Sequence, residues 1–346
     1  MIVARPGAGN AVTDVSDTRA PLPTVERVTV TVPGRLHLGF VDLNGGLGRR
    51  FGSVGIAIDT PQTRVSIDRS ERAQIEIVGS DAGRAHGHLE TLIRHFNLDH
   101  RLRLRIHDVI PSHVGLGSGT QLGLATGAAM SHLFGLGLDA RSIGRLLERG
   151  ARSSIGIATF EQGGVVLDGG RGDRDELPPV VSRLPFPERW RILLVYDHGK
   201  QGLHGPAEVE AFRQLPQFPA EVAAHLCRLM LMVALPALAE EDIDRFSMAV
   251  AELQRAIGDH FSPVQGARFM SDSVAQVLAW LQAEGIAGAG QSSWGPTGFA
   301  VIDGEVGAGK LLAAARRRWP PASGLSFAVS HGRNRGADIE ILSAKA

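Results

Sequence analysis

Cysteine, net charge and long apolar runs are all scarce in this 346-residue chain. The single cysteine, Cys227, excludes an intramolecular disulfide framework and a cysteine-rich metal site. The 36 basic and 36 acidic residues cancel, so no basic excess indicates a nucleic-acid partner. No stretch reaches the roughly 18 consecutive apolar residues of a membrane span, because Arg228 and Pro236 interrupt the best candidate. We therefore expect a soluble, cytoplasmic protein whose cysteine is buried rather than catalytic.

The remaining composition is that of an ordinary globular protein. Hydrophobic residues make up 43% of the chain and charged residues 21%, and the length suggests about two domains. Residues 1–24 contain no apolar segment that could act as a secretory signal, and they are predicted to be a flexible leader. The predicted domains span 25–185 and 186–346, without an internal repeat.

Hydrophobic periodicity predicts a mixed α and β chain. In the first half, strands are expected at 26–32, 54–58, 63–67, 73–78 and 102–110, and helices at 86–96, 121–134 and 140–149. In the second half, strands are expected at 192–196, 286–291, 297–302, 324–330 and 337–342, and helices at 219–238, 242–257, 267–283 and near 310–317. This order predicts that the last part is a small α/β sandwich.

The segment PSHVGLGSGT, residues 111–120, runs directly into a helix-forming stretch. Its glycines permit positive φ and a close backbone approach to a ligand, while Ser118 and Thr120 add hydroxyl groups where a helix begins. Unpaired amides and the helix dipole favour a bound phosphate. The alternative is an ordinary strand-to-helix turn, because the pattern matches neither the Walker nor the Rossmann motif.

Three glycine-marked segments occur in the order used by the galactokinase, homoserine kinase, mevalonate kinase and phosphomevalonate kinase (GHMP) superfamily. VPGRLHLGFVDLNGGLGRRFGSVGIAID (32–59) resembles the opening strand and turn of that superfamily. PSHVGLGSGT resembles its phosphate loop, and GAGQSSWGPTGF (288–299) its C-terminal glycine-rich motif. The resemblance implies an α+β, GHMP kinase-like fold of two subdomains: a ribosomal S5 domain 2-like N-terminal part and a ferredoxin-like α/β sandwich C-terminal part.

The chain departs from the kinases where they carry a catalytic aspartate. Ile157, Ala158 and Thr159 stand where that residue would be sought, so a kinase would lack its proton acceptor. PGRLHLGF, GLGSGTQ, FEQGGVVLDGG and GQSSWGPT are instead similar to the β-ribofuranosylaminobenzene 5′-phosphate synthases of tetrahydromethanopterin biosynthesis. That resemblance implies a homodimer that condenses phosphoribosyl pyrophosphate with 4-aminobenzoate, releasing CO₂ and pyrophosphate and forming a carbon–carbon link.

Such chemistry needs a stabilised pyrophosphate leaving group, a shielded ribosyl cation and a positioned aromatic ring. The amides of residues 115–120 and a Mg²⁺ ion suit the first demand. Arg35 and Lys200 suit a phosphate or the benzoate carboxylate, whereas Arg49 and Arg50 are equally interpretable as solvated loop charges. No general base is required, because loss of CO₂ restores aromaticity.

Other candidate residues each have a structural alternative. His37 faces away from Leu36 and Leu38 on a predicted strand, towards a cleft or as a satisfied core histidine. Asp42 and its neighbour Asn44 suit a metal or ribose contact, or simply a turn. Glu161 is the carboxylate nearest the missing kinase base, where it would orient an amine or Mg²⁺, or cap a turn.

Two further segments complete the predicted site. In the third motif, polar donors flank Trp294, which would grip the aminobenzoate ring or pack in the core. The stretch DHGKQGLHG, with His198, Lys200 and His204, is interpreted as a mobile loop over the substrates or as a plain surface loop. The predicted catalytic residues are Arg35, His37, Asp42 and Glu161, with Ser118 and Asp42 as candidate Mg²⁺ ligands. The predicted substrate-binding residues are Gly115, Leu116, Gly117, Ser118, Gly119, Thr120, Gln121, Lys200, Gln291, Ser292, Ser293 and Trp294.

Two rival functions remain open. One is an ATP-dependent small-molecule kinase of the same superfamily whose base has moved to Asp168 or Glu161. The other is a non-catalytic sugar-phosphate sensor on the same fold. ATP turnover would identify the first, and ligand binding without turnover would identify the second.

Overall fold

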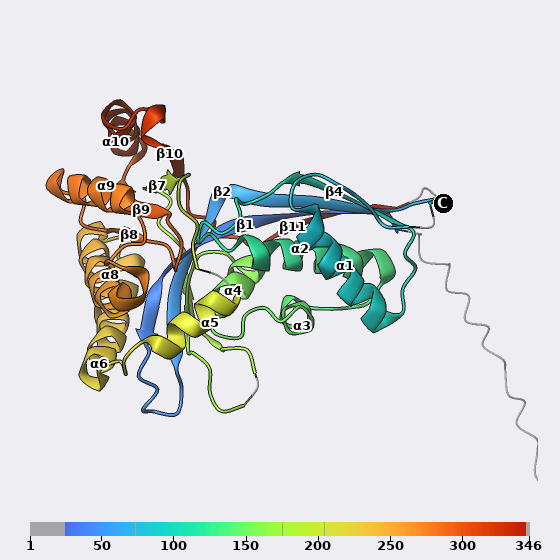
Figure 1. Cartoon of the computed structure of the whole chain (residues 1–346), viewed down its shortest axis with the longest axis horizontal. Coiled ribbons are helices and arrows are strands. Elements are labelled where there is room, and N and C mark those ends of the chain that lie inside the picture. Colours follow the sequence, from blue (N-terminus) through green and yellow to red (C-terminus); the bar gives the residue numbers. More distant parts are fainter. Residues whose placement is uncertain (1–24, 73, 175, 204, 344–346) are drawn as a thin grey trace, which may run out of the picture.

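A computed structural model describes residues 25–343 apart from 73, 175 and 204, and the leader predicted at 1–24 lies outside these residues, as does His204. Two sheets organise the fold (Figure 1). The helices α1 and α2 cover one face of the first sheet, and a second group of helices surrounds the other sheet. The protein thus has the α+β character expected from the sequence.

A long antiparallel ribbon of two strands forms the centre of the first sheet. β1 (Val25–Asp42) pairs with β2 (Phe51–Arg69), and the order across the sheet is β11-β1-β2-β4-β3, with β5 and β6 extending from β2. Alternate side chains of β1, such as Val28, Val30 and Val32, are fully buried against the helices. The other strands are β3 (Glu76–Val78), β4 (Leu102–Asp108), β5 (Val165–Asp168), β6 (Val180–Leu184) and β11 (Asp338–Ser343).

Helix α2 (Ser118–Phe134) lies at the centre of the first part, between the sheet and its neighbouring helices. Thirteen of its residues are buried, because small residues such as Gly123, Gly127 and Ala128 let neighbours approach from several sides. It ends at Gly135, whose φ of 66° closes the last turn. Its partners are α1 (Ala82–Phe96), α3 (Ala140–Leu146) and α4 (Ile155–Glu161). The N-terminus of α2 is thereby held rigidly beside β1.

The second sheet is antiparallel in the order β10-β7-β9-β8, and its strands occur in the chain as a ferredoxin-like fold requires. Its strands are β7 (Trp190–Asp197), β8 (Ala289–Gln291), β9 (Gly298–Asp303) and β10 (Leu325–Ser330). Leu193 and Val195 of β7 pack on α9 (Asp272–Ala283) and α10 (Glu305–Arg318), whereas Ile192 and Leu194 face the opposite core. The predicted α/β sandwich is confirmed.

The helical middle region packs against that opposite core. Phe246 and Leu253 of α8 (Ile243–Gln265) are buried there, together with residues of α6 (Ala220–Leu229), the π-helical turn η1 (Met230–Ala234) and α7 (Leu235–Ala239). By length and composition alone, Ala220–Ala239 is apolar enough to span a membrane, with a mean hydropathy of 1.9, but core helices can satisfy the same criterion. Figure 1 shows α6 and α8 side by side, as their contacts require.

Several element predictions need correction. The strands expected at 54–58 and 63–67 are one strand, because the TPQ segment between them forms an irregularity opposite Pro33 and Gly34 instead of a turn. The loop expected at 197–205 is followed by α5 (Gly205–Gln214), which begins at its last residue, and α9 begins at Asp272 rather than at 267. A 3₁₀ turn, η2 (Pro321–Ser323), precedes β10. The C-terminal strand β11 pairs with β1 and so returns to the first sheet.

Candidate active site

The three glycine-marked segments meet around Gly115. The carbonyl of Gly115 accepts hydrogen bonds from Arg35 Nη1 and from Ser292 Oγ, each at 2.8 Å. The amide of Arg35 donates to the carbonyl of Leu116 at 3.1 Å. Because these residues come from β1, the loop before α2 and the turn after β8, one carbonyl joins all three segments. The three segments, which are far apart in the sequence, therefore converge in the fold.

Glycine is required where these segments touch. A Cβ atom on Gly115 would lie 2.2 Å from the carbonyl oxygen of Ser292, and one on Gly295 would lie 2.3 Å from that of Val114. Gly115 also has a φ of 88°, which a side chain would strain. The amide of His37 in β1 donates to Ser292 Oγ at 3.0 Å, which links β1 directly to the turn after β8. These glycines therefore fix the position of the loop before α2.

The N-terminus of α2 is arranged to receive an anion. Its N-cap residue is Gly117, with a φ of 81° and no side chain to cap the helix, and no acidic residue occupies the first turn. The first amides of a helix have no intrahelical acceptors, and the helix dipole adds partial positive charge at this end. Ser118 and Thr120 contribute hydroxyl groups beside these amides. The predicted anion cradle is thus consistent with the backbone geometry.

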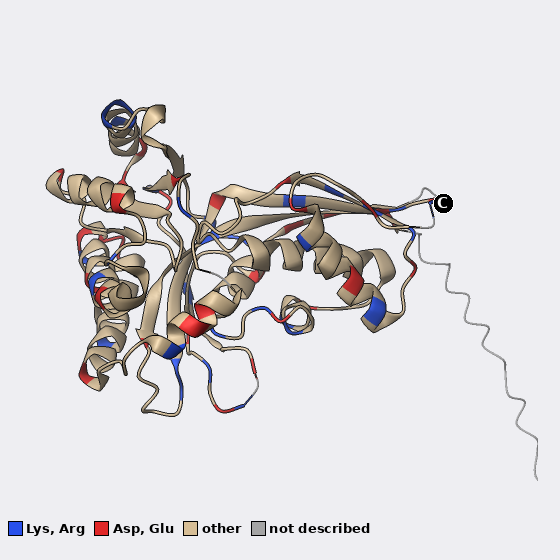
Figure 2. Ribbon diagram, viewed as in Figure 1, with Lys and Arg blue, Asp and Glu red and all other residues tan. Residues whose placement is uncertain are grey.

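A cavity of about 380 Å³ opens at this helix terminus, and we call it the phosphate-loop cavity. Three arginines line it: Arg35 from β1, Arg84 from α1 and Arg149 from the segment after α3. Glu208 of α5 is the one carboxylate among its lining residues, and it forms a 2.5 Å ion pair with Arg152. The cavity is therefore electropositive, although basic and acidic residues are interspersed over the rest of the molecule (Figure 2). Its lining comprises Arg35, Arg84, His113, Gly115, Gly117, Ser118, Gly119, Thr120, Arg149, Gly202, Leu203, Gly205, Glu208, Ser293, Trp294 and Gly295.

Burial lowers the pKa of two of these arginines. Burial lowers the pKa of Arg35 to about 10, partly offset by the charge of Glu208. The pKa of Arg149 is lowered by burial and by the nearby charge of Arg84. Arg84 is held by Asp81 and Ser112, each 2.6 Å from its Nη2. Such desolvated cations interact with an anion more strongly than solvated ones would.

Sequence reasoning missed Arg84 and Arg149, because neither belongs to a glycine-marked segment. Arg84 begins a predicted helical region, and Arg149 stands near the end of a short helix, where arginine is common for reasons unrelated to ligands. Only the fold brings them to α2. No pattern in a single sequence distinguishes them from the other surface arginines.

His37 lies behind the phosphate-loop cavity rather than in it. Its ring is 3% exposed, lies 4.7 Å from the ring of Phe40 and lines a separate cavity of about 20 Å³. Burial, followed by the charge of Arg35, lowers the pKa of His37 to about 3, so the ring is neutral near pH 7. Both ring nitrogens lack a hydrogen-bond partner. The structure thus places His37 in a core position next to the site.

The amides and the tryptophan of the predicted binding set act as connections between elements. Gln121 donates to the carbonyl of Gly156 at 2.9 Å, and Gln291 accepts from the amide of Met270 at 2.6 Å. The ring of Trp294 stacks on Phe261 with centroids 4.1 Å apart, and is 2% exposed. Its indole is therefore packed in the core, which was the structural alternative for this residue.

Asp42, Lys200 and Glu161 do not line the phosphate-loop cavity. Asp42 Oδ1 accepts hydrogen bonds from the amides of Asn44 and Gly45, as an aspartate that forms a turn does. Asp42 is seven positions along β1 from Arg35, which corresponds to roughly 20 Å. Lys200 and Glu161 are exposed on the surface. The structure therefore does not bring these three residues together with the loop.

A second, apolar cavity of about 330 Å³ lies at the far end of the β1–β2 ribbon, and we call it the hairpin-end cavity. Asp168 lies at its wall, 1% exposed, and accepts five hydrogen bonds. The donors are the amides of Ser53, Ser154 and Gly170 and the hydroxyls of Ser53 and Ser153. Burial raises the pKa of Asp168, against the effect of these bonds. This carboxylate joins β2, β5 and the start of α4.

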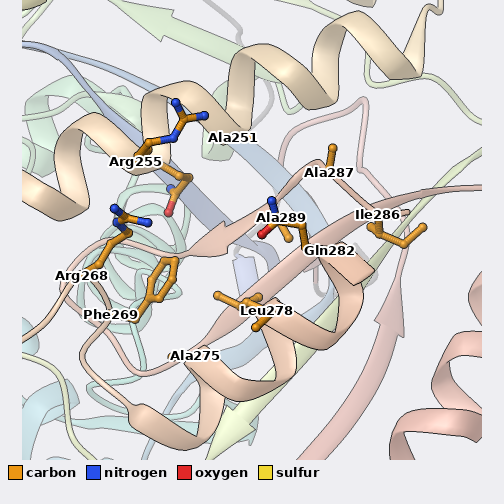
Figure 3. A pocket seen from close by; sticks show the side chains of 12 residues that line it. Ala251, Arg255, Arg268, Phe269, Ala275, Leu278, Gln282, Ile286, Ala287 and Ala289 are labelled. Carbon is orange, nitrogen blue, oxygen red and sulfur yellow. The ribbon is translucent and has the colours of Figure 1, made fainter. Parts of the chain in front are cut away.

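A third cavity, of about 240 Å³, lies between α8 and α9 (Figure 3). Figure 3 shows the guanidinium groups of Arg255 and Arg268 at one end of it, with Phe269 and Leu278 below. Arg268 is paired with Asp259, at 2.6 Å. Of the three glycine-marked segments, only Ala289 contributes to the lining. The phosphate-loop cavity is therefore the candidate active site.

Comparison with known proteins identifies the superfamily. Residues 84–164 match the model of the GHMP kinases N terminal domain, and residues 234–321 match that of the GHMP kinases C terminal domain. The fold is similar to that of homoserine kinase from Cytophaga hutchinsonii, with 17% identity and a TM-score of 0.64 over 93% of this chain and 100% of that one. Mevalonate diphosphate decarboxylase from Staphylococcus aureus gives 13% identity and a TM-score of 0.64, over 91% and 98% of the chains.

Curated relatives narrow the assignment. The chain is 31% identical to the beta-ribofuranosylphenol 5'-phosphate synthase of Methanothermobacter thermautotrophicus over 90% of this chain and 98% of that protein. It is likewise 31% identical to the enzyme of the same name from Archaeoglobus fulgidus, over 89% and 98% of the chains. The chain therefore belongs to the beta-ribofuranosylphenol 5'-phosphate synthases, transferase-type enzymes of the GHMP kinase superfamily.

Proposed function

We propose that the protein joins phosphoribosyl pyrophosphate and 4-aminobenzoate through a carbon–carbon bond, releasing CO₂ and pyrophosphate in tetrahydromethanopterin biosynthesis. The observation that carries this proposal is the phosphate-loop cavity. It combines the uncapped N-terminus of α2 with three arginines, and has a single carboxylate that is already paired. A strongly anionic diphosphate matches such a site.

The chain's own groups stabilise the leaving group. As the bond between the anomeric carbon and the diphosphate breaks, its electron pair leaves with the diphosphate, and negative charge grows on the bridging oxygen. Amides at the start of α2 and the guanidinium of Arg35 are fixed before the reaction by the contacts around Gly115. Preorganised donors of this kind stabilise a developing anion without reorganisation.

The carbon nucleophile explains the missing kinase base. The ring carbon that bears the carboxylate attacks the anomeric carbon, while the amino group supplies electron density. The bond to the carboxylate then breaks and its electrons restore the aromatic ring, so no proton has to be removed. Ile157 and Ala158, in the place of the kinase aspartate, are buried in α4 and contribute to the core.

Mg²⁺ is proposed as the cofactor, and the residues present suit a metal that arrives with the diphosphate. Within the described residues, no group of three or more His, Cys, Asp or Glu side chains could hold a metal ion. Mg²⁺ often uses one or two protein ligands and several phosphate oxygens. Glu208 and Ser118 would be those ligands, whereas Asp42 is in the hairpin-end cavity. The bound ion would neutralise diphosphate charge.

The aromatic substrate has one alternative. The relatives are named for a phenol product, which would follow from 4-hydroxybenzoate rather than 4-aminobenzoate. A hydroxyl group donates electron density to the ring in the same manner as an amino group. We propose 4-aminobenzoate as the substrate, and direct competition between the two acids would distinguish them.

The kinase alternative has little support from the site. Asp168 has five hydrogen-bond donors and lines the hairpin-end cavity, and Glu161 is exposed at the end of α4. Neither lines the phosphate-loop cavity, where the hydroxyl group of a phosphoryl acceptor would have to lie. A sugar-phosphate sensor would bind the donor in this cavity but would not turn it over.

The test is a direct assay of both products. Purified protein is mixed with Mg²⁺, phosphoribosyl pyrophosphate and 4-aminobenzoate labelled in its carboxylate. We expect labelled CO₂ and pyrophosphate in equal amounts, and no ADP in a parallel reaction with ATP. Binding of the donor without CO₂ release would support the sensor, and ADP formation would support the kinase. Either result would overturn the proposal.

We also propose that the enzyme acts in the cytoplasm as a homodimer. The single cysteine is consistent with a reducing compartment. Leu231 and Met232 of η1 are more than 60% exposed and offer an apolar surface for a second copy. Sedimentation of wild type and of Leu231→Glu would test the assembly, because the charge would dissociate a dimer formed through this surface.

A further inference from the structure

We propose that the phosphate-loop cavity contains two separate anion subsites, one at the loop and Arg35 and a second at Arg84 and Arg149. This inference rests on the proposed function and assigns the substrate class more closely. The ligand is a sugar that carries a diphosphate at its reacting carbon and a phosphate monoester at the other end.

The first subsite lies where the loop enters α2. A Cβ atom on Gly117 would lie 3.0 Å from Cγ and 3.2 Å from Nε of Arg35, so the guanidinium stem is directly beside this part of the loop. Arg35 Nη1 is fixed by the carbonyl of Gly115. The remaining donors of this guanidinium and the first amides of α2 converge on one anion.

The second subsite begins on the other side of the helix terminus. A Cβ atom on Gly119 would lie 3.5 Å from Arg84 Nη1, and that nitrogen is 3.4 Å from Ser118 Oγ. Asp81 balances the charge of Arg84 and orients its guanidinium. Arg84 therefore lies beside the loop, and its charge acts on Arg149, which lines the same cavity.

Arg149 has only a weak counter-charge, that of the neighbouring Glu148. Among the described residues, no carboxylate forms an ion pair with it, its side chain makes no hydrogen bond, and its Nε is buried. A desolvated cation beside a second cation is unfavourable unless an anion joins them. The arrangement is therefore suited to a ligand phosphate between Arg84 and Arg149.

His88 of α1 lies beneath this end, packed against α2 at Gly123, and does not line the cavity. It is 7% exposed, and its Nε2 is buried without a partner, 3.5 Å from where a Cβ on Gly123 would lie. Burial and the charges of Arg149 and Arg84 lower its pKa to about 4. The cavity itself, at about 380 Å³, gives room for a sugar ring between two phosphate groups.

Calorimetric titration of the full chain with Mg²⁺ present separates the subsites, with pyrophosphate and ribose 5-phosphate as the probes. Arg149→Met should weaken ribose 5-phosphate at least about tenfold and change pyrophosphate affinity less than about threefold. Arg35→Met should show the reverse pattern. Arg145→Met, an exposed arginine on α3, is the matched control and should bind both probes as the wild type does.

The outcomes distinguish this inference from the proposed function. If the wild type binds both probes but Arg149→Met weakens them equally, the two-subsite arrangement is wrong, although the diphosphate site stands. If Arg149→Met binds both probes equally more weakly and its far-ultraviolet spectrum is altered, the variant has misfolded. Arg149→Lys, which keeps the charge, then decides. Weaker binding of ribose 5-phosphate alone supports the second subsite, whereas an equal effect on both probes overturns it. A wild type that binds neither probe would contradict the proposed function itself.

Discussion

The stretch of the β1–β2 ribbon from Arg35 to Asp42 carries a cavity at each end, and the two cavities have similar volume and opposite character. At the Arg35 end, cations outnumber the single carboxylate, Arg149 Nε has no hydrogen-bond partner among the described residues, and the N-terminus of α2 is uncapped. At the Asp42 end, Asp168 has five donors and Asp42 accepts from its own turn. Polar groups that are already satisfied hold a fold together, whereas desolvated and unpaired ones are ready for a ligand.

The same comparison explains why the first glycine-marked segment contains both residues of the candidate site and residues of a hairpin turn. PGRLHLGF passes the phosphate loop, and DLNGG forms the turn at the hairpin end of the ribbon. A segment that reads as one motif in the sequence therefore serves two places roughly 20 Å apart. A strand this long cannot place Arg35 and Asp42 around one small reacting centre.

The largest expected effect is the loss of a cation at the Arg35 end. Arg35→Met should lower kcat/KM about 100- to 1000-fold, because it removes a preorganised donor from the developing diphosphate. Arg50→Met, at the hairpin end, should leave kcat/KM within about threefold of the wild type. Steady-state assays of pyrophosphate release measure both. Similar losses in the two variants would remove the distinction between the ends.

At the hairpin end, Asp168→Ala should lower the stability of the fold rather than the rate of the reaction. It leaves buried amides and hydroxyls without their acceptor, so the free energy of unfolding should fall by about 3 kcal/mol. Urea unfolding measures this loss, and the protein that remains folded should keep its kcat. A kinase-type base at Asp168 would produce the contrary result, with activity abolished and stability little changed.

Lowering the pH should reduce the stability of the folded protein through His88, which is buried near the phosphate-loop cavity. The folded pKa of His88 is about 4, below the ordinary value of 6.5, so between these values the unfolded chain binds a proton that the folded chain does not. Stability therefore falls as pH falls, by about 2 kcal/mol from pH 7 to pH 5 for this residue. Urea unfolding of wild type and His88→Leu at both pH values isolates that amount. Parallel pH dependence in the two proteins would rule out a neutral, buried His88.

The smallest effect is expected at Cys227, beside the hairpin-end cavity. Cys227 is exposed on α6, not buried as the sequence suggested. Partial desolvation and the charge of Asp42 nevertheless raise the pKa of its thiol, which makes it a poor nucleophile at neutral pH. Cys227→Ala should leave kcat unchanged and alter the free energy of unfolding by less than about 1 kcal/mol. A large loss of activity would show that the hairpin end takes part in catalysis.

The architecture could be predicted from the sequence because local residue patterns identified most strands and helices, and the order of these elements along the chain indicated the fold. Alternation identified β1, β4 and β7, and the order of strands and helices indicated the ferredoxin-like second sheet. The prediction failed at 54–67, where Pro61 resembles a turn but lies within one continuous strand. The glycines near 199–205 suggested a loop, and α5 begins at the last of them.

The candidate site was recovered only where glycine marked it. Gly115 and Gly117 belong to a glycine-rich segment that is visible in the sequence, and their positive φ angles and close neighbours explain why glycine stands there. Arg35 was identified because it lies in another glycine-marked segment. Nothing in the sequence marks Arg84 and Arg149 as site residues, since the pattern around an arginine in or near a helix is the same whether its side chain faces solvent or a ligand. Trp294 resembled a ligand platform, but the fold supplies Phe261 as its stacking partner.

The central claim is that a diphosphate leaves the anomeric carbon from the α2 terminus while a ring carbon takes its place. The most direct measurement uses a donor labelled with ¹³C at the anomeric carbon and 4-aminobenzoate labelled at the ring carbon that bears the carboxylate. We predict a one-bond carbon–carbon coupling in the product spectrum. A product in which the anomeric carbon is bonded to nitrogen or oxygen, with no such coupling, would contradict the account.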